Sequence, residues 1–479
     1  MLNRRNFLRN TGAALGGLGL AGLLAQDGLL ASDDPTNFSG KTPLRPAIDP
    51  DNPYAPRAPH FHASAKQVLV IYCPGAGSHV DTFDPKPDIN KLAKEKANVT
   101  EAPFKFQEYG QSGTVVSELL PHISKHVDDL CVIRSMQGDT NTHEHAQTFT
   151  FTGVAQNNSP VPTLGNWVVY GLGCESKTLP ALVSLGEMNP TPAEPYFLPA
   201  WTAGVMLKNK DKQKKGEKDP IIPNLTNTRL TRAQQRQQLD FIQRMNRAYL
   251  QGQTTDDRLN ARIESFERAF RMQMEATDAF DISSETEATK KAYGIGQEET
   301  DEYAERCIIA RRLAERDVRF IVVPFSRPPK SQALARMFGW DSHEQNNTLT
   351  PILCKRHDQP IAALLADLKR RGMLEDTLVV WGGEFGRTAG SRVGKRGREH
   401  NCNGYTMFLA GGGVKGGLTY GESGPTANGV ARDKVHVHDL NATILHLLGL
   451  DHEKLTYRAG GKDVRLTDVY GDVVKSILV

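Results

Sequence analysis

Near-continuous apolar runs alternate with stretches of helical periodicity along this chain, and that alternation constrains its fold more than any other feature. Each run is rich in valine, isoleucine and leucine and ends at glycine or polar residues. A strand that is buried on both faces of a parallel sheet has this continuous apolar character, whereas a half-buried strand alternates. We therefore predict strands at 67–73, 129–136, 181–186, 318–325, 377–383 and 405–413.

Helical periodicity marks the segments between these runs. Apolar residues recur at three- and four-residue spacing through much of 227–318, and helices are also predicted at 360–376 and 438–450. The 227–318 region needs only one buried face, so we expect it to cover the sheet, with a lid or a dimer surface as open alternatives. Strands that alternate with helices indicate an α/β fold with a mostly parallel sheet.

The N-terminal segment, residues 1–31, resembles a twin-arginine export signal. Arg4 and Arg5 precede a glycine-rich apolar stretch at 13–25 that is too short for a comfortable membrane span. We predict a periplasmic or extracellular protein with transient membrane contact through this signal, and an uncleaved anchor stays open. Residues 32–64 are proline-rich and polar, which indicates a linker or surface wrap. Residues 65–479 are predicted to form a single domain.

Charge and cysteine content exclude some classes of protein. The net charge of +3 gives no electrostatic reason to expect nucleic-acid binding, and the basic run at 208–219 also contains acids, as a solvated loop does. The six cysteines are far apart without a CxxC pair, so a zinc knuckle is unsupported. Buried thiols are predicted, although disulfides in an exported chain stay open.

Candidate site residues with polar side chains follow several predicted strands, where an α/β sheet binds its ligands. These side chains are Asp81, His143, His145, Asp341, His343, Glu384, Arg387, Glu399 and His400. Carboxylates and imidazoles that converge on one point suit a divalent metal, with zinc, manganese, calcium and magnesium all open. Asp341 and His343 are two residues apart, so in an extended segment both leave the same face, and the spacing of His143 and His145 predicts the same.

Several of these features have simpler interpretations. Glu384 could pair with Arg387 alone, and the pair His436 and His438 precedes a helix that it could cap together with Asp439. The glycine-rich segment 410–417 lacks the spacing of a phosphate loop, so it is interpreted as a turn.

The motifs DTFDPKP, VIRSM, GWDSH, GGEFGRT, GREHN and HDLNATILHLLGLDHEKLTYR resemble the bacterial family known as domain of unknown function 1501. That family is similar to the alkaline phosphatase and sulfatase superfamily. The resemblance implies a doubly wound, mostly parallel sheet sandwiched by helices, with metals at the strand ends. It also implies metal ligands at Asp341 and His343 and at Glu384, which takes the place of a strand-end aspartate. With Asp81 added, the predicted metal ligands are Asp81, Asp341, His343 and Glu384.

The chain departs from sulfatases at the nucleophile. Counting back nine residues from Thr152 reaches His143, and no CxPxR or SxPxR pattern occurs, so formylglycine chemistry is not supported. His143 could be a nucleophile or ligand, a metal-bound water could attack, or catalysis could be lost. We predict catalytic roles for His143 and His400 in proton transfer and for Arg387 as a fork to the oxyanion.

These features favour an exported metal-dependent hydrolase of sulfate or phosphate esters, with an anionic ester or polysaccharide as substrate. The alternative is a metal-containing binding or surface-assembly protein of the same fold without turnover. A purely structural exported protein is a third interpretation. The sequence leaves the oligomeric state open.

Overall fold

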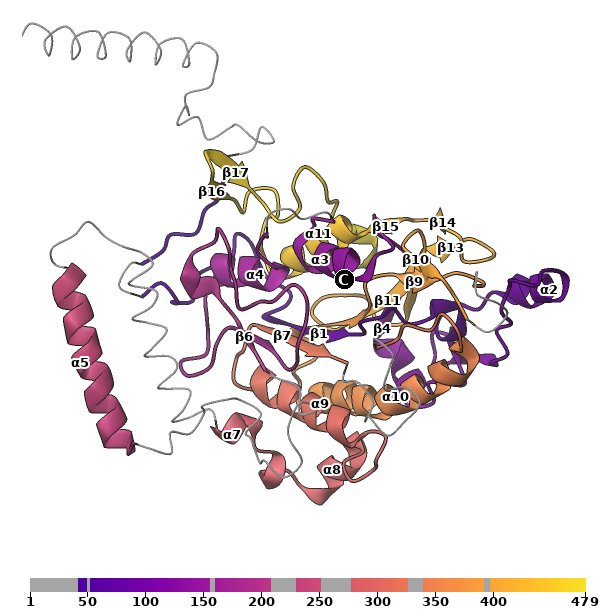
Figure 1. Ribbon diagram of the computed structural model, residues 1–479, viewed down its shortest axis with the longest axis horizontal. Coiled ribbons are helices and arrows are strands. Elements are labelled where there is room, and N and C mark those ends of the chain that lie inside the picture. Colours follow the sequence, from indigo (N-terminus) through magenta and orange to yellow (C-terminus); the bar gives the residue numbers. More distant parts are fainter. Residues whose placement is uncertain are drawn as a thin grey trace, which may run out of the picture. The chain divides into compact units, whose positions relative to one another are not determined.

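The computed structural model (Figure 1) describes residues 42–49, 52–155, 160–207, 230–250, 277–325, 339–391 and 397–479. Its contacts divide the chain into two units, one formed by residues 1–45 and 453–465 and the other by 46–452 and 466–479. In the smaller unit, β16 (Tyr457–Ala459) pairs antiparallel with β17 (Lys462–Val464). There the Arg45 guanidinium lies 2.6 Å from Asp463. The larger unit contains the candidate site.

A nine-stranded sheet forms the centre of the larger unit. In spatial order its strands are β12 (Leu418–Tyr420), β4 (Leu130–Gln137), β11 (Tyr405–Ala410), β8 (Thr377–Gly382), β1 (Gln67–Tyr72), β7 (Phe320–Pro324), β5 (Leu182–Ser184) and β6 (Val205–Met206), with β15 (Val435–His436) also paired to β4. Only β11 runs against its neighbours β4 and β8, and the other pairs in this sheet are parallel. The predicted mostly parallel α/β sheet is confirmed.

Helices cover both faces of this sheet, as Figure 1 shows. On one face lie α9 (Asp301–Ala314) and α10 (Asn346–Arg370), and on the other lie α3 (His143–Thr152), α4 (Leu164–Leu172) and α11 (Val437–Leu447). The described part also contains the helices α2 (Pro87–Glu95), α5 (Arg232–Leu250), α7 (Thr277–Phe280) and α8 (Glu287–Tyr293). Three short strand pairs lie outside the main sheet: β2 (Phe106–Tyr109) with β3 (Thr114–Ser117), β9 (Gly386–Arg387) with β10 (His400–Asn401), and β13 (Glu422–Ser423) with β14 (Val430–Arg432).

The strand β1 shows why its sequence is apolar throughout. All six of its residues are buried. Leu69 and Ile71 join the main hydrophobic cluster with residues of α9 and α10, while Val68, Val70 and Tyr72 alternate with them and are buried as well. Side chains of a strand point alternately to the two faces, so a sheet covered on both faces needs apolar residues at nearly every position.

The predicted strands and most predicted helices are confirmed, with three differences. Residues 164–172 form α4, which the glycine-rich pattern did not indicate, and α10 begins at Asn346 rather than at Pro360. Pro351 and Pro360 lie inside α10, where each removes a backbone donor, but the helix buries an apolar face that includes Leu353, Ile361 and Leu365. Tertiary packing therefore overrides the local helix-breaking signal.

The third difference concerns His143 and His145. They lie in the first turn of α3, so they do not share one face as an extended segment would require. His143 points to the candidate site, whereas His145 is exposed. The helix follows β4 after the loop 138–142, and the predicted geometry was wrong because the segment is helical.

The structure also describes the cysteines, the glycine-rich turn, the start of α11 and the proline-rich segment. All six cysteines are buried thiols. Most of the predicted turn 410–417 is confirmed, since β11 ends at Ala410 and turns follow over 411–417. Asp439 accepts a hydrogen bond from the His436 backbone N–H at the start of α11 (2.8 Å), as a capping role requires. Within the described ranges 42–49 and 52–64, the proline-rich segment has no helix or strand.

Some predicted segments lie outside the described residues: the export signal at 1–31, the basic run at 208–219 and the middle of the helical region, 251–276. No helix among the described residues is both long enough and apolar enough to cross a membrane.

Candidate metal centre at the strand ends

Four parallel strands of the sheet direct the segments that follow them to one edge. The strands β1, β4, β7 and β8 have the same direction, because β8 and β7 pair in parallel with β1, and β4 and β8 both run opposite to β11. Glu384 follows β8 directly, and α3 with His143 follows β4. The expectation that polar groups meet at the carboxyl ends of the strands is confirmed for these segments by their contacts.

Glu384 is fully buried and receives hydrogen bonds from three segments. Its Oε2 accepts from the Tyr72 hydroxyl (3.0 Å), at the end of β1. Its Oε1 accepts from the Gly75 backbone N–H (2.8 Å) and lies 2.7 Å from His143 Nδ1. The side chain has no exposed surface. Glu384 therefore joins the ends of β1, β8 and the start of α3, and a carboxylate held in this way orients the imidazole of His143.

Gly383 allows this carboxylate to reach β1. A Cβ atom placed on Gly383 would lie 2.6 Å from the Cys73 carbonyl oxygen and 3.2 Å from the Ala76 Cα. The loop after β1 is itself tight, since Gly75 and Ala76 both have positive φ, 93° and 63°. A non-glycine residue in this region of φ is uncommon and is maintained only by its surroundings.

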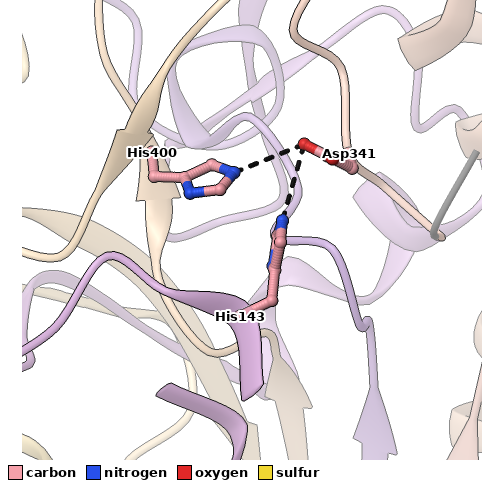
Figure 2. Close-up of side chains that lie close together, drawn as sticks. All are labelled: His143, Asp341 and His400. Atoms are coloured by element: carbon pink, nitrogen blue, oxygen red, sulfur yellow. Dashed lines mark hydrogen bonds and ion pairs between the residues drawn. The ribbon is translucent and has the colours of Figure 1, made fainter. Parts of the chain in front are cut away.

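Asp341 is the centre of the cluster, and Figure 2 shows His143 and His400 pointing toward it. Its Oδ1 lies 3.5 Å from His143 Nε2, 3.4 Å from His400 Nε2 and 3.2 Å from His343 Nε2. The Nε2 atoms of His343 and His400 are 2.8 Å apart. Three imidazoles from distant parts of the chain thus direct the same ring nitrogen to one carboxylate oxygen.

The opposite ring nitrogen of each imidazole faces an oxygen atom. His400 Nδ1 lies 2.6 Å from the Asn141 carbonyl oxygen, which only accepts, so Nδ1 carries the hydrogen. The acceptor for His143 Nδ1 is Glu384, and His343 Nδ1 lies 3.1 Å from Glu399 Oε2. In their neutral forms all three rings therefore present an unprotonated Nε2 to Asp341. Metal-binding histidines are held by outer partners in this way.

Arg387 holds Asp341 through a buried ion pair. It is fully buried, and its NH2 group donates to Asp341 Oδ1 (2.8 Å). Its other donors bond to the carbonyl oxygens of Gly75, Ala76 and Arg398. These four bonds engage the buried guanidinium, so Arg387 supports Asp341, and its predicted role as a fork to a substrate oxyanion stays a prediction.

Burial and neighbouring charges shift the pKa values of three residues in the cluster, Asp341, His143 and His343. Burial acts to raise the pKa of Asp341, but the hydrogen bonds that His143 and His400 donate from Nε2 in their protonated forms, together with Arg387, outweigh it and hold that pKa well below its usual range. Burial acts to lower the pKa of His143, and its bonds to Asp341 and Glu384 outweigh that effect and raise the pKa to about 9. For His343, burial dominates and lowers the pKa. The pocket therefore strongly favours positive charge around Asp341.

His143, Asp341 and His400 could hold a metal ion, since their ligand atoms lie within 4.8 Å of one another. In a tetrahedral site with bonds of roughly 2.0–2.1 Å, neighbouring ligand atoms are about 3.3 Å apart. The distances from Asp341 Oδ1 to the two imidazoles, 3.5 and 3.4 Å, are close to that value. The donor set of two imidazoles and one carboxylate fits a divalent transition metal.

Asp81 lies in a different, fully buried arrangement. Its carboxylate accepts from Arg398 Nε (2.8 Å) and NH2 (3.1 Å), from Asn346 Nδ2 (2.8 Å) and from Ser78 Oγ (2.5 Å). Both Asp81 and Arg398 have no exposed side-chain surface. These four donors occupy its oxygens, so the structure does not bring Asp81 to the cluster as a ligand.

Of the seven site residues predicted from sequence, the structure brings six together: His143, Asp341, His343, Glu384, Arg387 and His400. Their positions differ from the predicted roles, since Glu384 and Arg387 support the cluster from behind rather than face an open site. The sequence prediction missed Tyr72, Gly75 and the carbonyl of Asn141 as supports. Each lies at or just after the end of a predicted strand, which is the signal that could have indicated it.

A family model described as protein of unknown function (DUF1501) matches residues 65–478. No curated protein sequence matches the chain.

Similar solved structures include PsFucS1 sulfatase from Pseudoalteromonas sp., at 12% identity and a TM-score of 0.34, over 80% of this chain and 68% of that one. Phosphonate monoester hydrolase from Silicibacter pomeroyi has 12% identity and a TM-score of 0.35, over 87% and 76%. A protein of the alkaline phosphatase superfamily from Vibrio parahaemolyticus has 10% identity and a TM-score of 0.33, over 86% and 74%.

Proposed function

The chain belongs to the DUF1501 family, and on that premise we propose that it is an exported, metal-dependent hydrolase of sulfate or phosphate esters. One observation carries the proposal. His143 and His400 each engage Nδ1 with an oxygen acceptor and direct Nε2 to Asp341 Oδ1. The twin-arginine pattern at Arg4 and Arg5 supports export.

The metal ligands in this proposal are His143, Asp341 and His400. Three protein ligands with an open fourth position are the arrangement of catalytic rather than structural zinc sites. Such a metal, when bound, polarises an ester oxygen and makes a water nucleophilic at neutral pH. Zinc is the first candidate because imidazoles form most of the donor set.

The supporting residues fix the ligands. Glu384 holds the ring of His143, the Asn141 carbonyl holds that of His400, and Arg387 holds Asp341. Outer partners of this kind fix the tautomer and direction of a ligand, and their loss typically lowers metal affinity by about 10- to 100-fold. No covalent nucleophile is required, which is consistent with the missing CxPxR pattern.

His343 is assigned to proton transfer. It is the most exposed of the three imidazoles, at 31% of its side chain, and Glu399 stands behind its Nδ1 at 3.1 Å. Its Nε2 lies beside the proposed metal ligands, within 3.2 Å of Asp341 and 2.8 Å of His400. An imidazole held by a carboxylate at one nitrogen can take or give a proton at the other.

The test combines metal analysis with turnover. The purified protein is loaded with Zn²⁺, its metal content is measured by mass spectrometry, and 4-nitrophenyl sulfate and 4-nitrophenyl phosphate are offered as substrates. We expect about one metal per chain in the wild type, loss of the metal in Asp341→Asn and His400→Gln, and retention of the metal in His343→Gln. In His343→Gln we expect kcat to fall by at least about 100-fold.

His145→Gln is the matched control, because His145 lies on the same turn of α3 as His143 and is exposed. It should retain both metal and turnover. Full metal content in Asp341→Asn would contradict the ligand assignment. Metal without turnover of either ester would instead support a metal-containing binding protein of the same fold.

A further inference from the structure

A short segment of backbone, residues 98–101, lies beside the β9–β10 pair and has no role in the assignments above. The Thr100 backbone N–H donates to the Ala389 carbonyl oxygen (3.0 Å), and the Ser391 backbone N–H donates to the Asn98 carbonyl oxygen (3.0 Å). The pairing is antiparallel. The segment therefore forms a third line of backbone next to the arm that continues from β9.

The side chain of Thr100 reaches the other arm, residues 397–401, which contains β10. Its hydroxyl donates to the Gly397 carbonyl oxygen (2.6 Å), and the threonine has no exposed surface. The next residue, Arg398, is held separately, since its guanidinium donates twice to the Asp81 carboxylate. The hydroxyl of Thr100 thus acts on Gly397, while the buried ion pair acts on Arg398.

Gly397 lies directly against the backbone of His343. A Cβ atom placed on Gly397 would overlap the His343 carbonyl oxygen and would lie 2.6 Å from the Glu344 backbone nitrogen. The Arg398 backbone N–H also donates to the Ser342 carbonyl oxygen (3.2 Å). Because backbone touches backbone here, a displacement of Gly397 passes to His343 by direct contact.

The imidazole of His343 depends on this contact at both of its nitrogens. Its Nδ1 lies 3.1 Å from Glu399 Oε2, and its Nε2 lies 2.8 Å from His400 Nε2. Both partners belong to the arm that begins at Gly397. His400 is fixed at its own Nδ1 by the Asn141 carbonyl oxygen (2.6 Å), so a shift of Gly397 acts first on His343.

We propose that Thr100 is a positioning residue of this site, which through Gly397 holds His343 in register with Glu399 and His400. The inference rests on the proposed function for the proton transfer assigned to His343, whereas the position of His343 can be measured without turnover. Thr100 acts through Gly397 rather than on the substrate. Its loss should therefore lower turnover without releasing the metal.

Two substitutions separate the hydroxyl of Thr100 from its size. Thr100→Val removes the hydroxyl and nearly keeps the shape, and Thr100→Ser keeps the hydroxyl. For Thr100→Val we expect about one zinc per chain, an unchanged KM for the 4-nitrophenyl ester and a kcat lower by about tenfold, because a displaced proton-transfer group loses part of its effect. Thr100→Ser should restore kcat close to the wild-type value.

Chemical modification reports the position of His343 independently of hydrolysis. Diethyl pyrocarbonate modifies accessible imidazoles, and peptide mass spectrometry gives the rate at each histidine of the zinc-loaded protein. His343 has 31% of its side chain exposed, and its rate should rise several-fold in Thr100→Val as its contact with Glu399 loosens. His145 is exposed and serves as the internal reference, with the same rate in every variant.

Thr202→Val is the matched control. Thr202 is as buried as Thr100, and its hydroxyl also donates to a backbone carbonyl oxygen, that of Pro199 (2.8 Å). It lies beside α4, where its own carbonyl oxygen accepts from Asn166 Nδ2 (3.0 Å). Loss of this hydroxyl removes an equivalent bond and should change neither kcat nor the reactivity of His343.

The outcomes distinguish this inference from the hydrolase proposal. The inference is overturned if folded Thr100→Val keeps the wild-type kcat and His343 reactivity, if it loses zinc, or if Thr202→Val shows the same changes. Thermal unfolding checks the fold, and Thr100→Ala, which removes the same hydroxyl, replaces Thr100→Val if the latter does not fold. If the wild type cleaves neither ester but Thr100→Val alone alters His343 reactivity, the positioning role stands and the hydrolase proposal falls.

Discussion

At the scale of single residues, two aspartates illustrate how environment decides function. Asp341 and Asp81 both pair with a fully buried arginine, Arg387 and Arg398 respectively. Asp341 keeps 24% of its side chain exposed and faces three imidazoles, whereas Asp81 is completely enclosed by donors. The first is the residue that we propose binds a cation in addition to its arginine, and the second forms a buried ion pair.

Replacing Asp81 by asparagine should therefore destabilise the protein without removing its metal. The change leaves the Arg398 charge buried beside a neutral amide, and breaking a buried pair in this way typically costs about 3–5 kcal/mol. Denaturant unfolding monitored by fluorescence measures the loss, and mass spectrometry measures the metal content of the folded fraction.

Asp88→Asn serves as the comparison, because Asp88 forms only an exposed pair with Lys91. Its effect on the free energy of unfolding should be within about 0.5 kcal/mol. If Asp81→Asn lost metal as Asp341→Asn does, Asp81 would be a ligand after all, as the sequence suggested.

At the scale of elements, the contact between the ends of β1 and β8 determines the position of Glu384. The two strands are paired in parallel from Gln67 to Tyr72, and the loops beyond them approach closely at Gly383. A side chain at Gly383 meets backbone atoms of the β1 loop, which cannot rotate away as a flexible side chain can. The position of the carboxylate thus depends on a glycine that lies next to it in sequence.

Gly383→Ala should accordingly destabilise the fold and weaken metal binding. The added methyl would lie 2.6 Å from the Cys73 carbonyl oxygen, and relieving such overpacking typically costs about 1–3 kcal/mol. Chemical denaturation gives the stability, and titration with a competing chelator gives the zinc affinity. Gly138→Ala, whose Cβ would meet its nearest neighbour at 3.8 Å, should leave both quantities nearly unchanged. Equal behaviour of the two variants would contradict this account.

The sequence predicted the strands well because β1, β4, β7 and β8 are buried on both faces and their apolar composition leaves few alternatives. It also predicted that their ends deliver the site. It could not rank the residues there, because whether Glu384 faces a metal or stands behind His143 depends on side-chain direction. The helical start of α3 and the pairing of Asp81 with Arg398 depend on tertiary contacts that no local pattern records.

At the scale of the whole molecule, the site exists only when the sheet is complete. His143 and Glu384 are 241 positions apart, and the Asn141 carbonyl and His400 are 259 apart. The unfolded chain therefore has no preformed site, and metal binding is coupled to folding. Export in the folded state, which the twin-arginine pattern suggests, would allow this site to form and load before transport.

This coupling predicts that metal raises the thermal stability of the protein. A ligand that binds only the folded state stabilises it by about 2.7 kcal/mol when its free concentration is 100 times Kd. Differential scanning calorimetry of the chelator-treated protein with and without added Zn²⁺ should show a higher unfolding temperature with the metal. Asp341→Asn is the control and should show no shift, because it lacks the carboxylate on which His143 and His400 converge. Equal shifts in the wild type and this variant would place the stabilising metal elsewhere in the chain.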